Sequence, residues 1–356
     1  MPWIRCPYGC YFELPPWKWV GVFQKFPEGL LTCRCCHRSN RAMLYQEDAG
    51  SAAVAAVSGI VVPSGSQQQE IEISIKMRIS KLLGNINWFG YNQDRLVEQV
   101  FHDVVKMLIT SELTSNFPTP KIWPMLASAG ALKNMWAQGA SATDKYGKER
   151  NDGELKLFGS LPNVANLPTG EGRPYYIALS PGCLQQGAAP YYGRSYVVYK
   201  SAVKMRCTFS ATDSLQMLKQ SGEISTLDVN SISTIGNILM RVSDKQLLYL
   251  CSLANGGDAV SPNEFIEAQG WGSMNLATDI EIIVISQVDL TRMVTDTATH
   301  VDLMPSHFIS LNPEQRKQAI SALRNELAMF CNSHGITLKF LPLGPDTMNS
   351  KEKRPS

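Results

Sequence analysis

The sequence predicts a mainly β body with a few inserted helices, preceded by a small cysteine-rich module. Two observations predict the body. Many short stretches have the residue types and alternation of strands, and only two stretches have the apolar spacing of a helix. A third observation predicts the module, because five of the nine cysteines fall within the first 36 residues.

The cysteine spacing in residues 1–45 is typical of a zinc-ribbon-like module. Two pairs, C-x3-C and C-x2-C, are 22 residues apart, which is close to the spacing that brings four thiolates around one zinc ion. So short a segment has too few aliphatic residues to fold without such a metal. The expected ligands are Cys6, Cys10, Cys33 and Cys36, with Cys35 or His37 as possible substitutes.

The alternative for this module is a set of disulfides in a secreted protein. The first residues show neither the basic start nor the apolar run of a signal peptide, so a reducing compartment and zinc are expected instead.

The same module is basic, with a net charge of +4, whereas the rest of the chain has 27 basic and 29 acidic residues. Basic residues interleaved with aromatic ones are typical of surfaces that bind single-stranded nucleic acid. A charged surface that is merely solvated is an equally good interpretation. The candidate nucleic-acid contacts are Arg5, Lys18, Lys25, Arg34, Arg38 and Arg41.

Residues 46–70 are expected to be a linker with one short strand at Val54–Val62, because small residues there lead into a Pro, Ser, Gly and Gln segment. The body would then occupy residues 71–345 and a flexible tail residues 346–356. Its first element is expected to be a half-buried strand from Ile71 to Ser80, where apolar and polar residues alternate.

The remaining elements follow from the same patterns. The first helix is expected across Gln93–Leu113, and the second begins after Asn312 as N-cap, with Pro313 at its first position, and stops near Gly335. Further strands are expected at Leu155–Phe158, Tyr175–Leu179, Tyr196–Phe209, Ile238–Val242, Gln246–Leu253, Ile280–Val288 and Ile336–Leu341.

Composition suits a protein that buries surface against other subunits. Charged residues make up 18 % of the chain, below the roughly 25 % usual for soluble domains. Polar uncharged residues fill the difference, as in long loops and subunit contacts. No run approaches 18 apolar residues, so no membrane span is expected.

No catalytic motif is present, and we expect the chain not to be an enzyme. The loop residues His300, Asp302 and His307 could bind a metal, but loop polar groups are more often simply solvated. The alternating carboxylates Asp279, Glu281 and Asp289 are interpreted as a solvated strand face. Four isolated cysteines are expected to be core thiols: Cys183, Cys207, Cys251 and Cys331.

Two segments resemble strands of the capsid proteins of small single-stranded DNA viruses. These are the segment from Tyr196 to Phe209, with tyrosines and alternating basic residues, and the segment from Ala277 to Val288. The resemblance implies a jelly-roll antiparallel β-sandwich with helices inserted between strands, and a coat protein that self-assembles around a genome in the virion. The chain departs from that family because it has no Arg- and Lys-rich amino-terminal arm.

A second hypothesis belongs to another class of protein. In it, the chain is an intracellular regulatory or replication-accessory protein that binds nucleic acid through the zinc module. In that case, replacing Cys33 and Cys36 would abolish salt-sensitive binding to nucleic acid, whereas in a shell protein it would weaken the particle.

Overall fold

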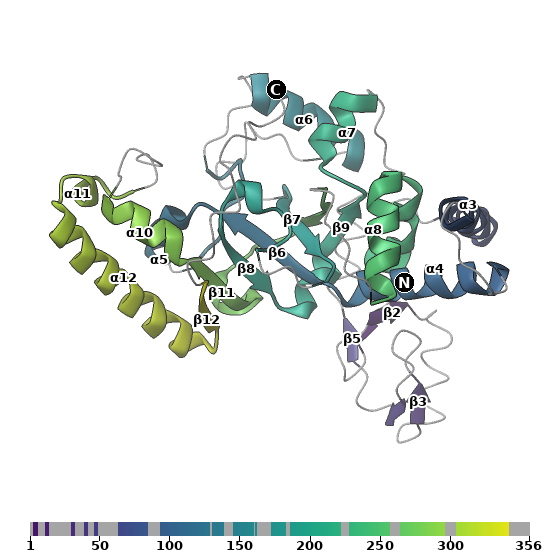
Figure 1. Cartoon of the computed structure of the whole chain (residues 1–356), viewed down its shortest axis with the longest axis horizontal. Helices are drawn as coiled ribbons and strands as arrows, with labels where there is room; N and C mark the ends of the chain where they lie inside the picture. Colours follow the sequence, from purple (N-terminus) through teal and green to yellow (C-terminus); the bar gives the residue numbers. More distant parts are fainter. Residues whose placement is uncertain are drawn as a thin grey trace.

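The structure is a computed structural model. It describes residues 63–84, 93–128, 130–138, 145–159, 161, 172–182, 186–221, 228–256, 264–295 and 304–341, and the backbone of five short strands before residue 49. Within these residues, one mixed sheet of seven strands forms the centre, and helices lie on both of its faces and at its ends (Figure 1).

The strand order in the central sheet is β12-β11-β8-β6-β7-β10-β9. All neighbouring strands are antiparallel except β11 and β12, which run parallel and are joined by helices. Strand bounds are β6 Glu112–Phe117, β7 Tyr175–Ser180, β8 Ser195–Tyr199, β9 Cys207–Ser210, β10 Ile266–Gly270, β11 Ile280–Ser286 and β12 Thr337–Leu341.

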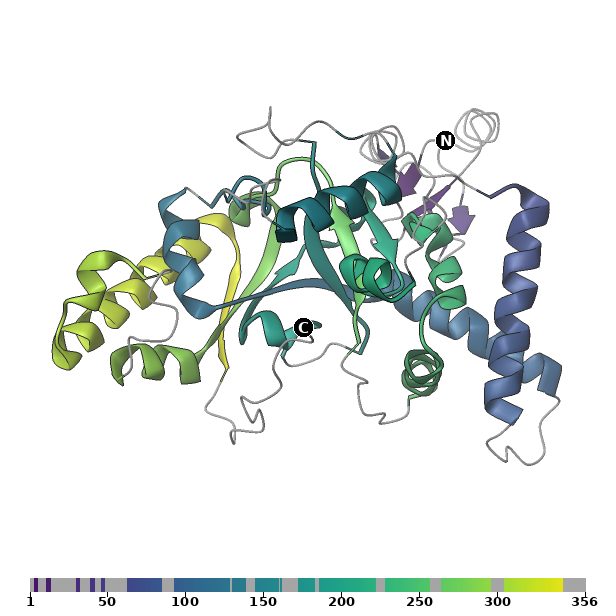
Figure 2. The ribbon, with the colours of Figure 1, turned by 90° about the horizontal axis from the view of Figure 1, so that it is seen from above.

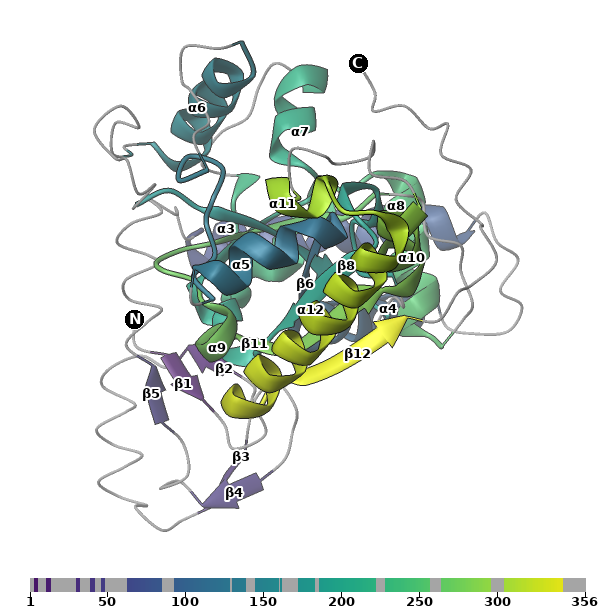
Figure 3. The ribbon, with the colours of Figure 1, turned by 90° about the vertical axis from the view of Figure 1, so that its left-hand side faces the viewer.

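The helices group around this sheet in three places. Those labelled α3, α4 and α8 lie at one end, α6 and α7 lie above the sheet in Figure 1, and α10 to α12 lie beside β11 and β12 (Figures 1 and 3). Figure 2 shows the first and the last of these groups at opposite ends of the molecule. The α-helices are α3 Gly65–Gly84, α4 Gln93–Thr110, α5 Ile122–Ala127, α6 Lys145–Phe158, α7 Ser214–Ser221, α8 Asp244–Ala254, α9 Leu276–Asp279, α10 Gln287–Thr295, α11 Ser306–Ile309 and α12 Pro313–His334. Short 3-10 helices are η2 Thr119–Lys121, η4 Pro190–Tyr192, η5 Ser201–Arg206 and η7 Ile232–Met240.

The main hydrophobic core lies on one face of the sheet. There, Leu179 of β7, Phe209 of β9 and Ile266 of β10 are fully buried and belong to one cluster with residues of α3, α4, α8 and η7. Because alternate residues of a strand point to opposite faces, the other face of the same strands carries a different set of side chains. That second face holds only small apolar clusters.

The predicted jelly roll needs a correction. A jelly roll consists of two facing sheets, whereas the described residues form a single large sheet covered by helices. The coarser prediction, a mostly antiparallel sheet with inserted helices, is confirmed. The fold of the body is mixed α and β, and the helical part is much larger than the sequence predicted.

The predicted strand Ile71–Ser80 was wrong, because this segment lies within helix α3. In the helix, Ile75 and Ile79 lie on one face with Leu83 and are buried, whereas Ile73 is 56 % exposed and Met77 is 62 % exposed. Alternating isoleucines therefore also satisfy the four-residue spacing of a helix, and the Gln, Glu, Lys and Met residues between them favour one.

Arg78 of α3 joins this helix to the junction of η7 and α8. Its guanidinium donates hydrogen bonds to the carbonyl oxygens of Leu239 (2.8 Å) and Val242 (2.6 Å) and to the carboxylate of Asp244 (2.6 Å). Since α3 begins at Gly65, the predicted end of the linker at residue 70 falls inside a helix.

Three other predicted strands are also helical. Leu155–Phe158 ends α6, Ile238–Val242 overlaps the end of η7, and Gln246–Leu253 lies in α8. Short apolar runs do not distinguish a strand from a buried helix. The residues that cap a helix at its start do make that distinction. Helix α8 has such a start signal, because Ser243 is its N-cap and accepts a hydrogen bond from the Gln246 backbone N–H (3.0 Å).

Several predicted elements are confirmed. Strands β7, β11 and β12 occupy the predicted positions, and α4 ends three residues earlier than expected. Tyr196–Phe209 forms two strands, β8 and β9, which η5 separates and which lie in different parts of the sheet. Helix α12 begins with a capping box between Asn312 and Gln315 and ends at Gly335, whose φ of 66° is in the left-handed region.

The amino-terminal strands are short. They form a three-stranded sheet in the order β2-β1-β5 and a separate hairpin of β3 and β4. Their bounds are β1 Trp3–Arg5, β2 Tyr11–Glu13, β3 Leu30–Thr32, β4 Ser39–Arg41 and β5 Gln46–Asp48. The predicted strand at 54–62 and the tail at 346–356 lie outside the described residues.

Within the part of the chain that the structure describes, none of the helices has both the length and the apolar character needed to cross a membrane.

Candidate active site

The second face of the sheet carries buried polar side chains, although packing alone would favour apolar ones. On β10, Ile266 and Ala268 point to the main core, while Glu267 and Gln269 point to the opposite face and are also buried. Glu267 is only 2 % exposed. A carboxyl group is rarely buried to this extent, so its surroundings decide what it can do.

Gln269 is held by the hydroxyl groups of the neighbouring strand β9. Thr208 Oγ1 donates to Gln269 Oε1 (2.7 Å), and Gln269 Nε2 donates to Ser210 Oγ (2.9 Å). The same amide nitrogen donates to Glu267 Oε1 (2.8 Å). The pairing of β9 with β10 therefore fixes the orientation of the Glu267 carboxyl.

Helix α6 covers this face and carries two of the site residues one turn apart, Arg150 and Glu154. Glu154 is fully buried and has its acceptors filled: Arg173 Nη1 lies 2.6 Å from Oε2, the Tyr176 hydroxyl donates to Oε1 (2.6 Å), and Trp136 Nε1 donates at 3.2 Å. So many donors make Glu154 an anchor that ties α6 to β7 and the segment before it.

Arg150 is also buried. Its guanidinium carbon lies 4.1 Å from the centre of the Tyr176 ring, and its Nη1 donates to Ser214 Oγ (3.0 Å). The backbone N–H of Ser214 points to Glu267 Oε1 (3.3 Å). Ser214 therefore links the guanidinium of α6 to the carboxyl of β10.

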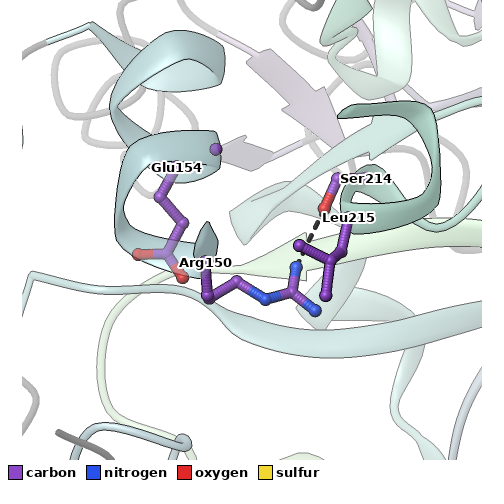
Figure 4. A pocket seen from close by; sticks show the side chains of 5 residues that line it. Arg150, Glu154, Ser214 and Leu215 are labelled. Carbon is purple, nitrogen blue, oxygen red and sulfur yellow. Dashed lines mark hydrogen bonds between the residues drawn. The ribbon is translucent and has the colours of Figure 1, made fainter. Parts of the chain in front are cut away.

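A small hollow opens at this point, with an empty volume of about 140 Å³ that includes open solvent. Figure 4 shows Arg150 and Glu154 approaching it from α6, and Ser214 and Leu215 from the start of α7. It is too narrow to enclose even a water molecule, and Glu267 is not among the residues that line it, so a ligand meets this part of the cluster at the surface.

Asp213 completes the cluster as the residue before α7. Its Oδ1 accepts hydrogen bonds from the backbone N–H groups of Leu215 (2.8 Å) and Gln216 (3.2 Å), the bonds of an N-cap. Its Oδ2 accepts from the Tyr192 hydroxyl (3.1 Å). Asp213 thus places a second carboxyl near Glu267.

These surroundings shift the ionisation of the Glu267 carboxyl toward neutral pH. Burial, and secondarily the charge of Asp213, raises the pKa of Glu267 to about 7, while Arg150 and the hydrogen bonds from Ser214 and Gln269 act in the opposite direction. Burial and the charge of Glu154 raise the pKa of the Tyr176 hydroxyl well above its ordinary value. Tyr176 therefore stays a hydrogen-bond donor, and Glu267 exchanges protons near neutral pH.

The predicted zinc ligands Cys6, Cys10, Cys33 and Cys36, and the substitutes Cys35 and His37, lie outside the described residues. So do Lys18, Lys25, Arg34 and Arg38, while Arg5 and Arg41 lie in β1 and β4, where only the backbone is described. Within the described residues, there is no group of three or more His, Cys, Asp or Glu side chains that could hold a metal ion.

The other sequence candidates are dispersed. Asp279 pairs with Arg206 (2.7 Å), and Asp289 accepts from Thr119 Oγ1 (2.8 Å), so these two carboxylates do not form an acid–base pair. His300 and Asp302 lie outside the described residues. Of the four predicted core thiols, Cys183 lies outside the described residues and the other three are buried. Burial raises their pKa values to about 12 for Cys207 and about 11 for Cys251 and Cys331.

Sequence reasoning missed every residue of the polar cluster. The one available signal was the segment Glu267-Ala-Gln-Gly-Trp271, which alternates in the manner of a strand but places polar and large residues on one face. Such alternation is ordinarily that of a strand with one solvated face. Only the tertiary structure shows that α6 and α7 cover this face.

A family model described as "Protein of unknown function (DUF3626)" matches residues 129–241, which is less than half of the chain. The matched segment contains Arg150, Glu154, Arg173 and Ser214, and it ends before Glu267. No curated protein matches the chain.

Proposed function

We propose that this protein is an enzyme, and that its active site is the buried cluster of Arg150, Ser214, Asp213 and Glu267. Glu267 acts as the general acid or base. The observation that carries the proposal is a carboxyl group whose pKa is raised to about 7 beside the guanidinium of Arg150, and which the Ser214 backbone and the Gln269 amide hold by hydrogen bonds.

The chemistry follows from the groups present. The ionised form of Glu267 accepts a proton from a substrate O–H or N–H group or from a water molecule, and the protonated form returns it to a leaving group. Arg150 supplies a fixed positive charge that stabilises negative charge on a substrate oxygen. The substrate is a small polar molecule that presents one oxygen-bearing group to Arg150.

The test measures one titration and one activity. The side-chain carboxyl carbon of Glu267, assigned by comparison with E267Q, should titrate near pH 7 in NMR spectra. Chromogenic carboxylic esters, phosphate esters and glycosides are then offered between pH 5 and 9. An activity that requires Glu267 should fall by about 10²–10⁴ in E267Q.

The matched control is E281Q, which removes one carboxyl from an exposed position of β11 and should leave the activity unchanged. An activity that survives in E267Q would contradict the proposal. So would a Glu267 carboxyl that titrates at its ordinary value.

The hypothesis of a self-assembling coat protein stays a prediction. The resemblance to jelly-roll capsid proteins suggested it, and a single sheet covered by helices lends that fold no support. Light scattering of the purified protein tests it directly, because a shell protein forms particles of many subunits and an enzyme forms a monomer or a small closed oligomer.

We also propose that the amino-terminal module binds zinc. What supports this is the pairing of the strands next to the cysteines. Strands β1 and β2 are antiparallel partners on either side of residues 6–10, and β3 and β4 are antiparallel partners on either side of residues 33–38. Two hairpins with cysteines in their connections are typical of zinc ribbons. Whether the basic residues of the module bind nucleic acid stays a prediction.

A further inference from the structure

Two adjacent tyrosines stand exposed next to the buried cluster. Tyr191 is 53 % exposed and Tyr192 is 44 % exposed, whereas the ring of Phe265 beside them is buried. The centres of the two tyrosine rings are 4.4 Å apart, and those of Tyr191 and Phe265 are 5.9 Å apart. Together Tyr191, Tyr192 and Phe265 form an aromatic platform.

The platform is rigidly held, although it lies in a connection between strands. Asn116 of β6 donates from its side chain to the carbonyl oxygens of Gln186 (2.8 Å) and Gly193 (2.9 Å) and accepts from the Ala189 backbone N–H (3.1 Å). A Cβ atom at Gly193 would lie 2.0 Å from the Phe117 carbonyl carbon, so no other residue fits there. Exposed rings held in this way are preorganised for a ligand.

The platform lies next to a carboxylate. The Tyr192 hydroxyl donates to Asp213 Oδ2 (3.1 Å), and the carboxyl of Glu267 also acts electrostatically on Tyr192. Desolvation of the half-buried side chain, followed by the charge of Asp213, raises the pKa of Tyr192, and the charges of Asp213 and Glu267 act in the same direction on Tyr191. Arg150, which contacts Ser214 and Tyr176, adds one positive charge to the same cluster.

We propose that the aromatic platform binds the cationic end of the substrate, an alkylammonium group, against the tyrosine rings and next to Asp213. Aromatic ring faces attract cations, and a nearby carboxylate adds to that attraction, whereas it disfavours an anion. The inference rests on the proposed function because it assigns the substrate of that same site. The substrate then carries an ammonium group in addition to its oxygen-bearing group.

The probe is choline, compared with 3,3-dimethylbutan-1-ol, which has the same shape and no charge. Both are titrated into the full-length protein by calorimetry. Choline should bind about tenfold more tightly than the neutral alcohol, the size expected for a partly desolvated cation on aromatic rings. Equal binding of the two, or binding of neither, would overturn the inference.

Variants place the binding on the platform. Y191A and D213N should each weaken choline binding several-fold, and Asn at position 213 keeps the oxygen that caps α7. Y191F keeps the ring and should bind choline as the wild type does, so it separates loss of the ring from a loss of folding. M329A removes a side chain that is 72 % exposed on α12 and is the remote control. Choline binding that Y191A and D213N leave unchanged would overturn the proposal.

The two proposals fail separately. If Glu267 titrates near pH 7 and choline does not bind, the platform assignment is wrong and the proposed active site stands. If choline binds through Tyr191 and the Glu267 carboxyl titrates at its ordinary value, the cation site stands and the proposed general acid–base role is wrong.

Discussion

Replacing Glu267 by Gln should make this protein more stable at alkaline pH, although the residue is buried in a hydrogen-bonded cluster. Gln has nearly the same shape, and its side-chain oxygen can accept the bonds that Gln269 and the Ser214 backbone now donate to Glu267 Oε1. What the variant lacks is a buried carboxyl that must ionise. Two charged groups face this carboxyl, Asp213 from the start of α7 and Arg150 from α6.

The magnitude follows from the pKa. An exposed carboxyl of this kind titrates at 4.5, and burial raises the pKa of Glu267 to about 7 in the folded chain. Between these two values the folded chain holds a proton that the unfolded chain has released, so stability falls as the pH rises through this window and stays lower above it. The difference corresponds to roughly 3 kcal/mol at pH 8 and vanishes below pH 4.

The assay is urea denaturation of the wild type and E267Q at pH 4, 6 and 8, with E281Q as the control for an exposed carboxyl. The variant should gain stability relative to the wild type step by step across this series, and E281Q should follow the wild type. A variant that is less stable at pH 8, or whose difference from the wild type is the same at every pH, would refute the argument that burial controls this carboxyl.

Three other outcomes follow from particular residues. Ile73→Asp should change the free energy of unfolding by less than about 0.5 kcal/mol, whereas Ile75→Asp should lower it by several kcal/mol, because α3 exposes the first and buries the second. Equal effects in urea denaturation would restore the strand interpretation. Arg173→Met should lower the free energy of unfolding by about 3–5 kcal/mol in the same assay, because it leaves the buried Glu154 carboxylate without its guanidinium partner. A loss under about 1 kcal/mol would show that the Arg173–Glu154 pair is solvated. Elemental analysis of the purified protein should find zinc in proportion to chain, and the double change of Cys33 and Cys36 to Ser should remove it; a zinc-free wild type would contradict the zinc proposal.

The elements predicted correctly have local causes. Helix α12 has an N-cap, a proline at its first position and a glycine at its end, and each of these acts within a few residues of the helix terminus. Strand β11 is rich in isoleucine and valine, which favour a strand, and β12 contains Thr337 and Phe340. Caps act locally and therefore hold in most tertiary surroundings.

The elements predicted wrongly have patterns that two structures satisfy. The alternation from Ile71 to Ser80 fits a strand with one buried face, and its subset Ile75, Ile79 and Leu83 fits one face of a helix. Only the surface that the segment meets selects between them. The hydrogen bonds of Arg78 to η7 and α8 are part of that surface, and they come from residues more than 160 positions away.

The candidate site could not be predicted from the sequence for the same reason. Arg150 and Ser214 are separated by 64 positions, and Ser214 and Glu267 by 53. Each of these residues has an ordinary sequence neighbourhood, and each would be solvated if it stood alone. Sheet order brings β9 beside β10, and α6 closes over them, so that one polar face becomes buried.

The sequence by itself determined the cysteine-rich start, the caps of α12, the apolar face of α4 and the buried thiols, because spacing, capping and hydrophobic periodicity are properties of a short stretch of chain. Only the tertiary structure decided that the body has one sheet, that the first isoleucine-rich segment is a helix, and that Glu267 is a buried acid. Burial and the pKa that follows from it depend on which distant segments exclude water, and no local pattern carries that information.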